Sequence, residues 1–326
     1  MTLRLYDLEF STLLMEKEYP KSFYSSTEEV EESVICLEHF MGKGVYKEIY
    51  FEGVHIAYGD AMLSNKVQLG FESDFETIEM HFALKGSSTT LAENFDSEIS
   101  FEPHRHNIIY ANKVCGEMKW ESNQLQLCEI NLAPSFFKKF LPPGSPIFDN
   151  FRNTVEKGNS GLLKNENLYI TNEMYDIINQ IVNCQRQGIF KRMFLEAKVI
   201  ELLLLQLEQF SENSVSNFSI KKSDIDKIYA VREFILHNLD SASSLIELAH
   251  NAGTNEFILK KGFRELFGTS VFAFWSDVKM EQAKDLLINH NMNIGEVSQL
   301  VGYKYQRHFS AAFKKKYGML PSQFRK

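Results

Sequence analysis

The last third of the chain contains an internal repeat in its pattern of apolar residues and glycines. Residues 245 to 268 form the first copy, and residues 294 to 318 form the second. In each copy the spacing predicts a short helix, a turn at a glycine and a second helix that ends before another glycine. This is the pattern of two helix-turn-helix units in tandem. The matched pairs are Leu245 and Ile294, Leu248 and Val297, Ala252 and Val301, Gly253 and Gly302, Leu259 and Phe309, Phe263 and Phe313, and Gly268 and Gly318.

Between the two copies, residues 271 to 289 are predicted to form one amphipathic helix. It follows Thr269 and Ser270, which are good N-cap residue types. At 1.5 Å per residue its length is roughly 28 Å. Helix pairs near the two ends of such a rod would lie about one DNA turn apart, so one chain can cover both halves of its own site. The expected apolar stripe is Phe272, Trp275, Met280, Ala283 and Leu287.

Between about Lys47 and Asn131 the pattern changes to short runs in which apolar and polar residues alternate. The clearest runs are residues 50 to 58, 76 to 85, 107 to 110, 116 to 121 and 125 to 131. A period of two, broken by Gly, Asn, Asp and Ser, predicts an antiparallel β barrel or sandwich. Ahead of these strands, a helix is expected at residues 27 to 41, beginning at Thr27.

Two further segments, residues 172 to 186 and 190 to 210, carry apolar residues at helical spacing. They form either a dimer seam or a cover for the sheet of the β-rich region. The polar run that follows them predicts a linker. The chain is therefore predicted to be an α+β protein. Its expected parts are a β-rich domain at residues 1 to 160, a helical connector at 161 to 210, a linker at 211 to 219 and an all-α domain at 220 to 326.

Charge divides the chain in the same way. The formal net charge is −8, yet residues 220 to 326 contain 16 Lys and Arg against 11 Asp and Glu, and residues 1 to 219 contain 19 against 32. A basic end suits contact with DNA phosphates.

No apolar segment is long enough for a signal peptide or a bilayer span, so we expect a soluble, cytoplasmic protein that binds no membrane. The cysteines are expected to be small buried residues of a reduced protein: Cys36, Cys115, Cys128 and Cys184.

Over about the last hundred residues the chain resembles the AraC/XylS family of bacterial transcription regulators. The resemblance implies a regulator, more often an activator, that binds double-stranded DNA and contacts RNA polymerase. It also implies a cupin-like N-terminal barrel that binds a small-molecule effector, and a homodimer formed through the connector helices. Residues 196 to 199 and 259 to 263 resemble the siderophore-uptake branch. The motifs are IELA (246 to 249), LKKGFRELFG (259 to 268), MEQAKDLL (280 to 287), IGEV (294 to 297), GY (302 to 303), FSAAFK (309 to 314), YG (317 to 318) and PSQFR (321 to 325).

In the first copy, the helix face opposite Leu259 and Phe263 is free to enter the major groove of DNA. The resemblance places Phe257, Lys260 and Lys261 at the family's base-contacting positions, where Lys can donate to guanine and Phe can contact a thymine methyl group. Glu256 either accepts from cytosine or, as the favoured alternative, stabilises the helix N-terminus. The full candidate set is Asn255, Glu256, Phe257, Lys260, Lys261 and Arg264.

In the second copy, Gln306 and Arg307 have the bidentate donor geometry that discriminates adenine and guanine. Ala311 occupies a position where the family often has a longer polar side chain, so base contact there is expected to be limited. We therefore expect stronger sequence specificity under the first unit. The full candidate set is Tyr305, Gln306, Arg307, Ser310 and Lys314, with Lys314 either on phosphate or in solvent.

Several residues suggest functions that their surroundings do not favour. His104 and His106 have the spacing of a cupin metal site, but no carboxylate follows them, so we expect two exposed loop histidines and no metal, cofactor or catalytic residue. The alternatives to an effector-controlled regulator are a cupin-like metalloprotein or enzyme with a regulatory DNA-binding tail, and a regulator controlled by its abundance or by a protein partner. Two other features are expected to serve packing. Gly262, in the middle of a predicted helix, is expected to allow close approach of a neighbouring helix. The following aromatic residues are expected to lie in cores: Phe82, Tyr110, Trp120, Phe263, Trp275, Phe309, Phe313 and Tyr317.

Overall fold

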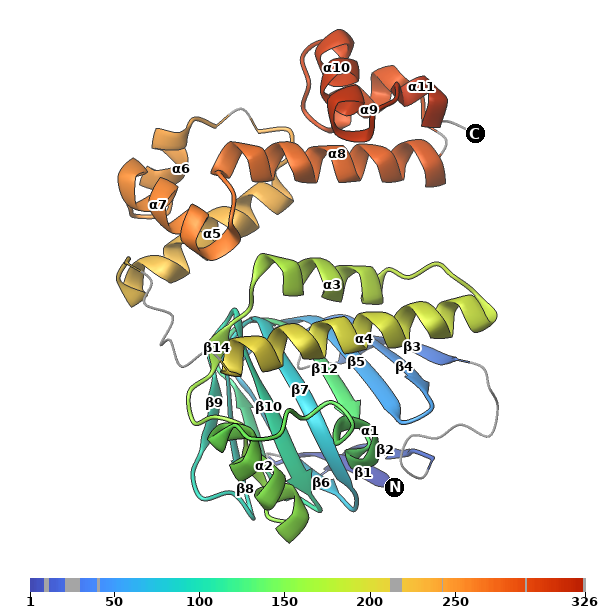
Figure 1. Cartoon of the computed structure of the whole chain (residues 1–326), viewed down its shortest axis with the longest axis vertical. Coiled ribbons are helices and arrows are strands. Elements are labelled where there is room, and N and C mark those ends of the chain that lie inside the picture. The colour runs from blue at the N-terminus through green and yellow to red at the C-terminus, as the bar shows by residue number, and fades with distance from the viewer. Residues whose placement is uncertain are drawn as a thin grey trace. The chain divides into compact units, whose positions relative to one another are not determined.

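The computed structural model describes residues 1 to 8, 12 to 20, 30 to 39, 42 to 211, 219 to 241, 243 to 290 and 292 to 324. The chain divides into two compact units, Met1–Val215 and Ser216–Lys326 (Figure 1). Most of the expected linker, together with Thr27 and Arg325, lies outside the described residues. Within the described part, no helix combines the length and apolar character that crossing a membrane requires.

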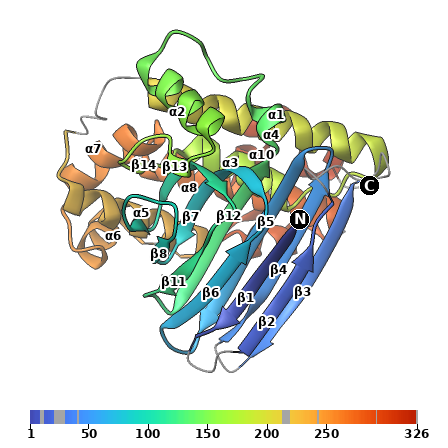
Figure 2. The ribbon, with the colours of Figure 1, turned by 90° about the horizontal axis from the view of Figure 1, so that it is seen from below.

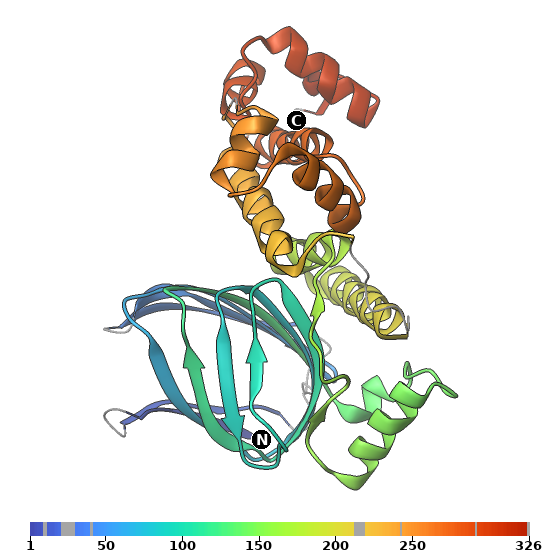
Figure 3. The same cartoon turned by 90° about the vertical axis from the view of Figure 1, so that its left-hand side faces the viewer.

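The N-terminal unit is built on two antiparallel sheets that face each other (Figure 3). The smaller sheet has the strand order β2 (Thr12–Glu18), β1 (Thr2–Asp7), β6 (Val67–Ser73), β11 (Cys115–Trp120), β8 (Ser88–Ala92) and β9 (Ile99–Phe101); β1 lies between β2 and β6 (Figure 2). The larger sheet has the order β13 (Gly161–Leu162), β10 (Arg105–Asn112), β7 (Glu76–Lys85), β12 (Gln124–Leu132), β5 (Val54–Leu63), β4 (Gly42–Phe51) and β3 (Glu31–His39), and β14 (Leu168–Tyr169) also pairs with β10.

The prediction of a helix at residues 27 to 41 is wrong for the residues of this segment that the structure describes. Residues 31 to 39 form β3, which pairs with β4 from Glu31 opposite Tyr50 to His39 opposite Gly42. Pairing with a neighbouring strand satisfies the backbone of this segment, and the β-branched Val34 and Ile35 suit a strand. Cys36 on β3 is exposed and Cys115 is partly exposed, so only Cys128 and Cys184 are buried as expected.

Two helices cover the outer face of the larger sheet (Figure 1). On β7, the outward side chains Ile78, Met80 and Phe82 are fully buried, while Glu79 and His81 alternate with them and point between the sheets. The covering helices are α3 (Asn172–Val182) and α4 (Gly188–Ser211), at the two positions where helices were predicted. Two shorter helices, α1 (Pro134–Phe137) and α2 (Pro146–Lys157), follow the last long strand.

The C-terminal unit consists of helices arranged along α8 (Val271–Asn289), the predicted connecting helix (Figure 1). Rings of Tyr229, Phe263, Phe267 and Phe274 pack together near its N-terminal end. Phe272, expected in the apolar stripe, is instead 54% exposed. A second core joins Met280, Ala283, Leu287, Val297, Val301, Phe309 and Phe313. The other helices are α5 (Lys222–His237), α6 (Leu245–Asn251), α7 (Glu256–Phe267), α9 (Ile294–Leu300), α10 (Gln306–Tyr317) and α11 (Pro321–Phe324).

The α+β class is confirmed, with antiparallel β structure before a helical domain that contains two helix-turn-helix units.

Candidate nucleic-acid interface

The first helix of each unit begins with the same reciprocal cap. Before α6, the Ser244 hydroxyl accepts from the Glu247 backbone N–H at 3.2 Å, and the Glu247 carboxylate accepts from the Ser244 N–H at 2.7 Å. Before α9, Asn293 and Glu296 make the equivalent pair at 2.8 and 3.2 Å. A capping box satisfies two N–H groups that the helix leaves free, so both units begin at fixed positions.

Glycines form the turns and the ends of both units. Gly253 and Gly302, in the turns, have φ of 68° and 75°. Gly268 and Gly318 end α7 and α10 with φ of 67° and 75°. These positive angles cost glycine little, which is why the repeat preserves glycine at both places. The predicted tandem architecture is therefore confirmed down to its turns.

Gly262 sets the rotation of α7. A Cβ atom at this position would lie 2.0 Å from the Ile228 Cδ1 and 2.7 Å from the Ile220 Cδ1. The close helix packing expected at Gly262 is thus confirmed, and α5 is the neighbour. Together with buried Leu259 and Phe263, this contact directs the opposite face of α7 into solvent.

On that exposed face, the candidate residues have different local partners. Asn255 caps α7, since its side-chain oxygen accepts from the Ile258 N–H at 2.9 Å. Glu256 binds Lys260 at 2.7 Å in an exposed ion pair. Phe257 is 71% exposed, which is unusual for a large apolar side chain and suits contact with base methyl groups. Arg264 is exposed, while Lys261 is partly buried.

The exposed face of α10 is more basic than that of α7. Tyr305, Gln306, Arg307 and Lys314 are exposed, and Ser310 is partly buried. The Arg307 guanidinium lies 5.4 Å from the centre of the Tyr305 ring, which restrains it beside the start of the helix. Helix α10 contains no carboxylate, whereas α7 contains Glu256 and Glu265. Lys316 is engaged elsewhere, 3.0 Å from Asp277 and 3.2 Å from Glu281.

The two histidines expected in an exposed loop are instead buried. His104 is 8% exposed and its Nδ1 lies 2.6 Å from the Tyr175 hydroxyl on α3. His106 is 0% exposed, with its Nε2 2.7 Å from Gln209 Oε1 and its Nδ1 2.8 Å from Gln206 Nε2, both on α4. Burial lowers the pKa of His106 to about 4, so its ring is neutral, accepts from Gln206 and donates to Gln209. Both ring nitrogens of His106 therefore form hydrogen bonds that connect β10 to α4.

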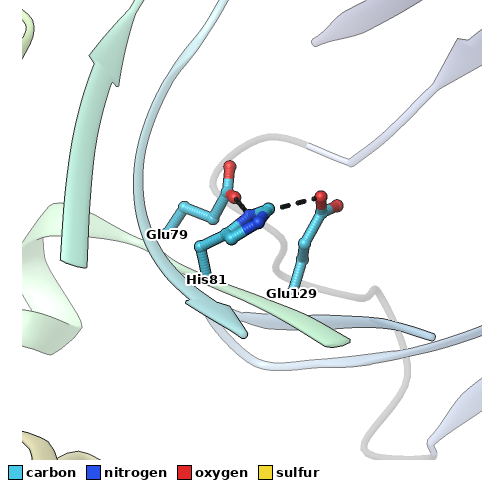
Figure 4. A group of neighbouring side chains, drawn as sticks. All are labelled: Glu79, His81 and Glu129. Carbon is cyan, nitrogen blue, oxygen red and sulfur yellow. Dashed lines mark hydrogen bonds and ion pairs between the residues drawn. The ribbon is translucent and has the colours of Figure 1, made fainter. Parts of the chain in front are cut away.

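The interior between the sheets holds a polar group that we did not predict. The side chains of Glu79 and His81 on β7 and Glu129 on β12 converge there (Figure 4). His81 Nδ1 lies 2.7 Å from the Glu79 carboxylate and 3.6 Å from the Glu129 carboxylate. The signal was present in the alternation of residues 76 to 85, where charged residues and His occupy the positions between the apolar ones. We call these three residues the interior cluster.

Most of the aromatic residues expected in cores are buried, including Phe82 and Tyr110 on the outer face of the larger sheet, while Trp120 and Tyr317 are partly exposed.

Comparison with known proteins agrees with this architecture. Residues 48–219 match the family described as the regulatory protein PchR N-terminal domain, and residues 248–326 match a helix-turn-helix domain family. The chain belongs to the AraC/XylS family of transcriptional regulators. Its N-terminal unit is of the PchR type.

Individual relatives match parts of this chain. The regulatory protein PchR of Pseudomonas aeruginosa is 34% identical over 123 residues, which are 37% of this chain and 42% of that protein. The arabinose operon regulatory protein of Escherichia coli is 30% identical over 152 residues, which are 46% of this chain and 50% of that protein. The C-terminal domain of AraT, a response regulator from Geobacillus stearothermophilus, has 30% identity, a TM-score of 0.29, and coverage of 30% of this chain and 83% of that chain. The chain thus spans half or less of the length of these two curated relatives.

Proposed function

We propose that this family member is a sequence-specific regulator of transcription that acts on double-stranded DNA in the cytoplasm. The observation that supports this most directly is the duplication of a capped helix-turn-helix unit whose second helix exposes aromatic and basic side chains. In α7 these are Phe257, Lys260 and Arg264, and in α10 they are Arg307 and Lys314. Each set has the donors and apolar groups that bases and phosphates require.

The interface is tested by selecting bound DNA from a random pool with the full-length protein. Arg307→Ala should weaken binding to the selected sequence about 5- to 150-fold, because one bidentate contact to a base contributes about 1 to 3 kcal/mol. Lys316→Ala is the matched control on the same helix, because Lys316 binds Asp277 and Glu281. If no sequence is enriched, or if Arg307→Ala leaves both motif and affinity unchanged, the proposed role of α10 is wrong.

We propose that a small-molecule effector binds between the two sheets of the N-terminal unit. The inner face of the larger sheet carries polar as well as apolar side chains, and Glu79 and Glu129 keep 21% and 24% of their side-chain surface accessible there. On the outer face, His106 lies opposite Phe82 of β7 and is hydrogen-bonded to α4, which ends at Ser211 before the chain continues to the DNA-binding unit. An effector that binds one arrangement of β7 and β10 better than another would bias the position of α4. Activation through contact with RNA polymerase is the expected output.

We further propose that α4 pairs two copies of the chain. Its buried residues, such as Leu195, Val199 and Leu202, cover the sheet. A second apolar row runs along its solvent side with spacings of three and four residues, as in a coiled coil: Phe190, Met193, Ala197, Ile200 and Leu204. In this row Phe190 is 72%, Met193 61% and Leu204 52% exposed. Covering the sheet and forming a dimer seam are therefore compatible roles for the connector, because they use different faces of α4.

Sedimentation of the full-length protein tests the seam. Met193→Glu with Leu204→Glu should convert a dimer to a monomer, because a charge opposite an apolar partner loses its hydration. Glu156→Lys, exposed on α2 and away from this row, is the control. A wild-type protein that stays monomeric both at high concentration and on its DNA would exclude this seam.

A further inference from the structure

We propose that the interior cluster, Glu79, His81 and Glu129, binds one divalent first-row transition-metal ion such as Zn²⁺ or Mn²⁺. The site would lie inside the N-terminal unit, apart from the DNA-contacting helices. It rests on the proposal that the space between the sheets takes a ligand, but metal binding can be measured without DNA.

The geometry brings three suitable donors to one point. Glu79 and His81 are two residues apart on β7 and so share its inner face, and Glu129 lies directly opposite His81 on β12. One ligand atom from each residue lies within 4.8 Å of the other two. Metal–ligand bonds of about 2.1 Å separate adjacent ligand atoms by roughly 3.0 to 3.4 Å, so small side-chain rotations suffice for coordination.

The donor set selects a class of ion. One imidazole and two carboxylates suit zinc, manganese or ferrous iron, whereas hard ions such as Mg²⁺ prefer oxygen ligands and retained water. His106 offers no alternative ligand, because its described contacts occupy both of its ring nitrogens.

Space and charge at the cluster also favour a cation. The side chains of Glu79, His81 and Glu129 keep 21%, 11% and 24% of their surface accessible, although the Phe101 ring lies 4.0 Å from the His81 ring. Two carboxylates held this close repel each other, and a divalent ion between them would remove that repulsion.

A second acidic group on the inner face already has a cation. Glu48 on β4 is fully buried and bonds to Lys17, to the Tyr19 hydroxyl at 2.9 Å and to His55 at 3.2 Å. The Lys17 ammonium balances its charge. In the interior cluster, the described ion-pair partner of both carboxylates is His81, and this difference singles the cluster out as the place for an added cation.

The test is titration of the metal-free full-length protein with ZnCl₂ or MnCl₂ by calorimetry, with MgCl₂ as the comparison. We expect one ion per chain, a higher melting temperature with Zn²⁺ and at least tenfold weaker binding of Mg²⁺. Glu79→Gln and Glu129→Gln should each weaken Zn²⁺ binding at least tenfold, because each removes an anionic ligand while keeping the side-chain size. Glu121→Gln, on the exposed pair with Lys66, should bind Zn²⁺ as the wild type does.

Circular dichroism and melting without metal identify any variant that fails to fold, and His81→Gln serves as a further variant if one does. Absence of Zn²⁺ and Mn²⁺ binding, or binding that survives the double variant Glu79→Gln with Glu129→Gln, would overturn the proposal. Measuring DNA affinity in chelator in parallel separates this result from the proposed function: DNA binding without metal binding refutes only the metal site, and metal binding without specific DNA binding refutes only the regulator.

Discussion

In the N-terminal unit, polar side chains such as Glu48, His55 and His106 are almost fully buried, whereas the C-terminal unit keeps most of its polar groups on the surface. The described buried polar residues of the C-terminal unit are Asp224, Arg232 and Ser298. Burying a polar group costs stability unless hydrogen bonds replace its water. The N-terminal unit therefore depends on specific tertiary partners, while the C-terminal unit depends on apolar cores and local caps.

The largest expected effect is a loss of stability at acid pH, caused by the buried His106. Burial lowers the pKa of His106 to about 4, while in the unfolded chain it is about 6.5. Between these values the unfolded state binds more protons, so stability falls as pH falls, by about 3 kcal/mol at pH 4. His106→Gln should lack this contribution, so the stability difference between wild type and variant should shrink from pH 7 to pH 4. Urea unfolding of the N-terminal unit at several pH values measures it.

The control for acid sensitivity is His308→Gln in the C-terminal unit, where the ring is exposed. Its pH profile should match that of the wild type. An equal change in both variants would mean that the two units do not differ in this respect.

The second effect concerns packing in the C-terminal unit. Gly262→Ala should destabilise it by about 1 to 3 kcal/mol, because the added methyl group would overlap Ile228, although Ala is the better helix former. The equivalent position in the second copy is Ala312, and Ala312→Gly should cost about 1 kcal/mol from helix propensity alone. Thermal unfolding compares the two. If Gly262→Ala stabilises the unit, α5 does not restrict that site.

The third effect concerns the local caps. Asn255→Ala removes the side-chain oxygen that accepts from Ile258 and should cost about 1 kcal/mol. Asn255→Asp keeps an acceptor and should retain most of the stability. The Tyr305 side chain makes no capping hydrogen bond at the start of α10. Tyr305→Ala should therefore not lower the stability of the unit through loss of a cap. Equal losses at Asn255 and Tyr305 in chemical denaturation would contradict this difference.

The smallest effect distinguishes α7 from α10, the two helices proposed to contact DNA. Glu256→Gln frees Lys260 and removes a carboxylate from the proposed DNA surface. An exposed pair is worth about 0.2 to 1 kcal/mol, so DNA affinity should rise by a factor of about 1.5 to 5. The salt dependence of binding should steepen as Lys260 becomes available to phosphate. Unchanged affinity and slope in a mobility-shift titration would place Glu256 away from DNA.

Prediction succeeded where the decisive interactions are local. The glycine turns and helix-forming periods of the C-terminal unit are encoded within a few residues, so α8 begins and ends where expected. The segment at β3 was mistaken for a helix because its partner strand, not its own pattern, decides its conformation. Histidines 104 and 106 were mistaken for exposed residues because Tyr175, Gln206 and Gln209 lie about 70 to 100 residues away in sequence.

The sequence by itself determined the repeated helix-turn-helix units, the alternation of the strands and which residues of each strand share a face. It did not determine which face of the larger sheet lies inside. Both faces are covered, one by α3 and α4 and the other by the smaller sheet, and a period of two is the same whichever way the strand is turned. Only the tertiary structure placed Ile78 and Met80 under the helices, and Glu79, His81 and Glu129 together between the sheets.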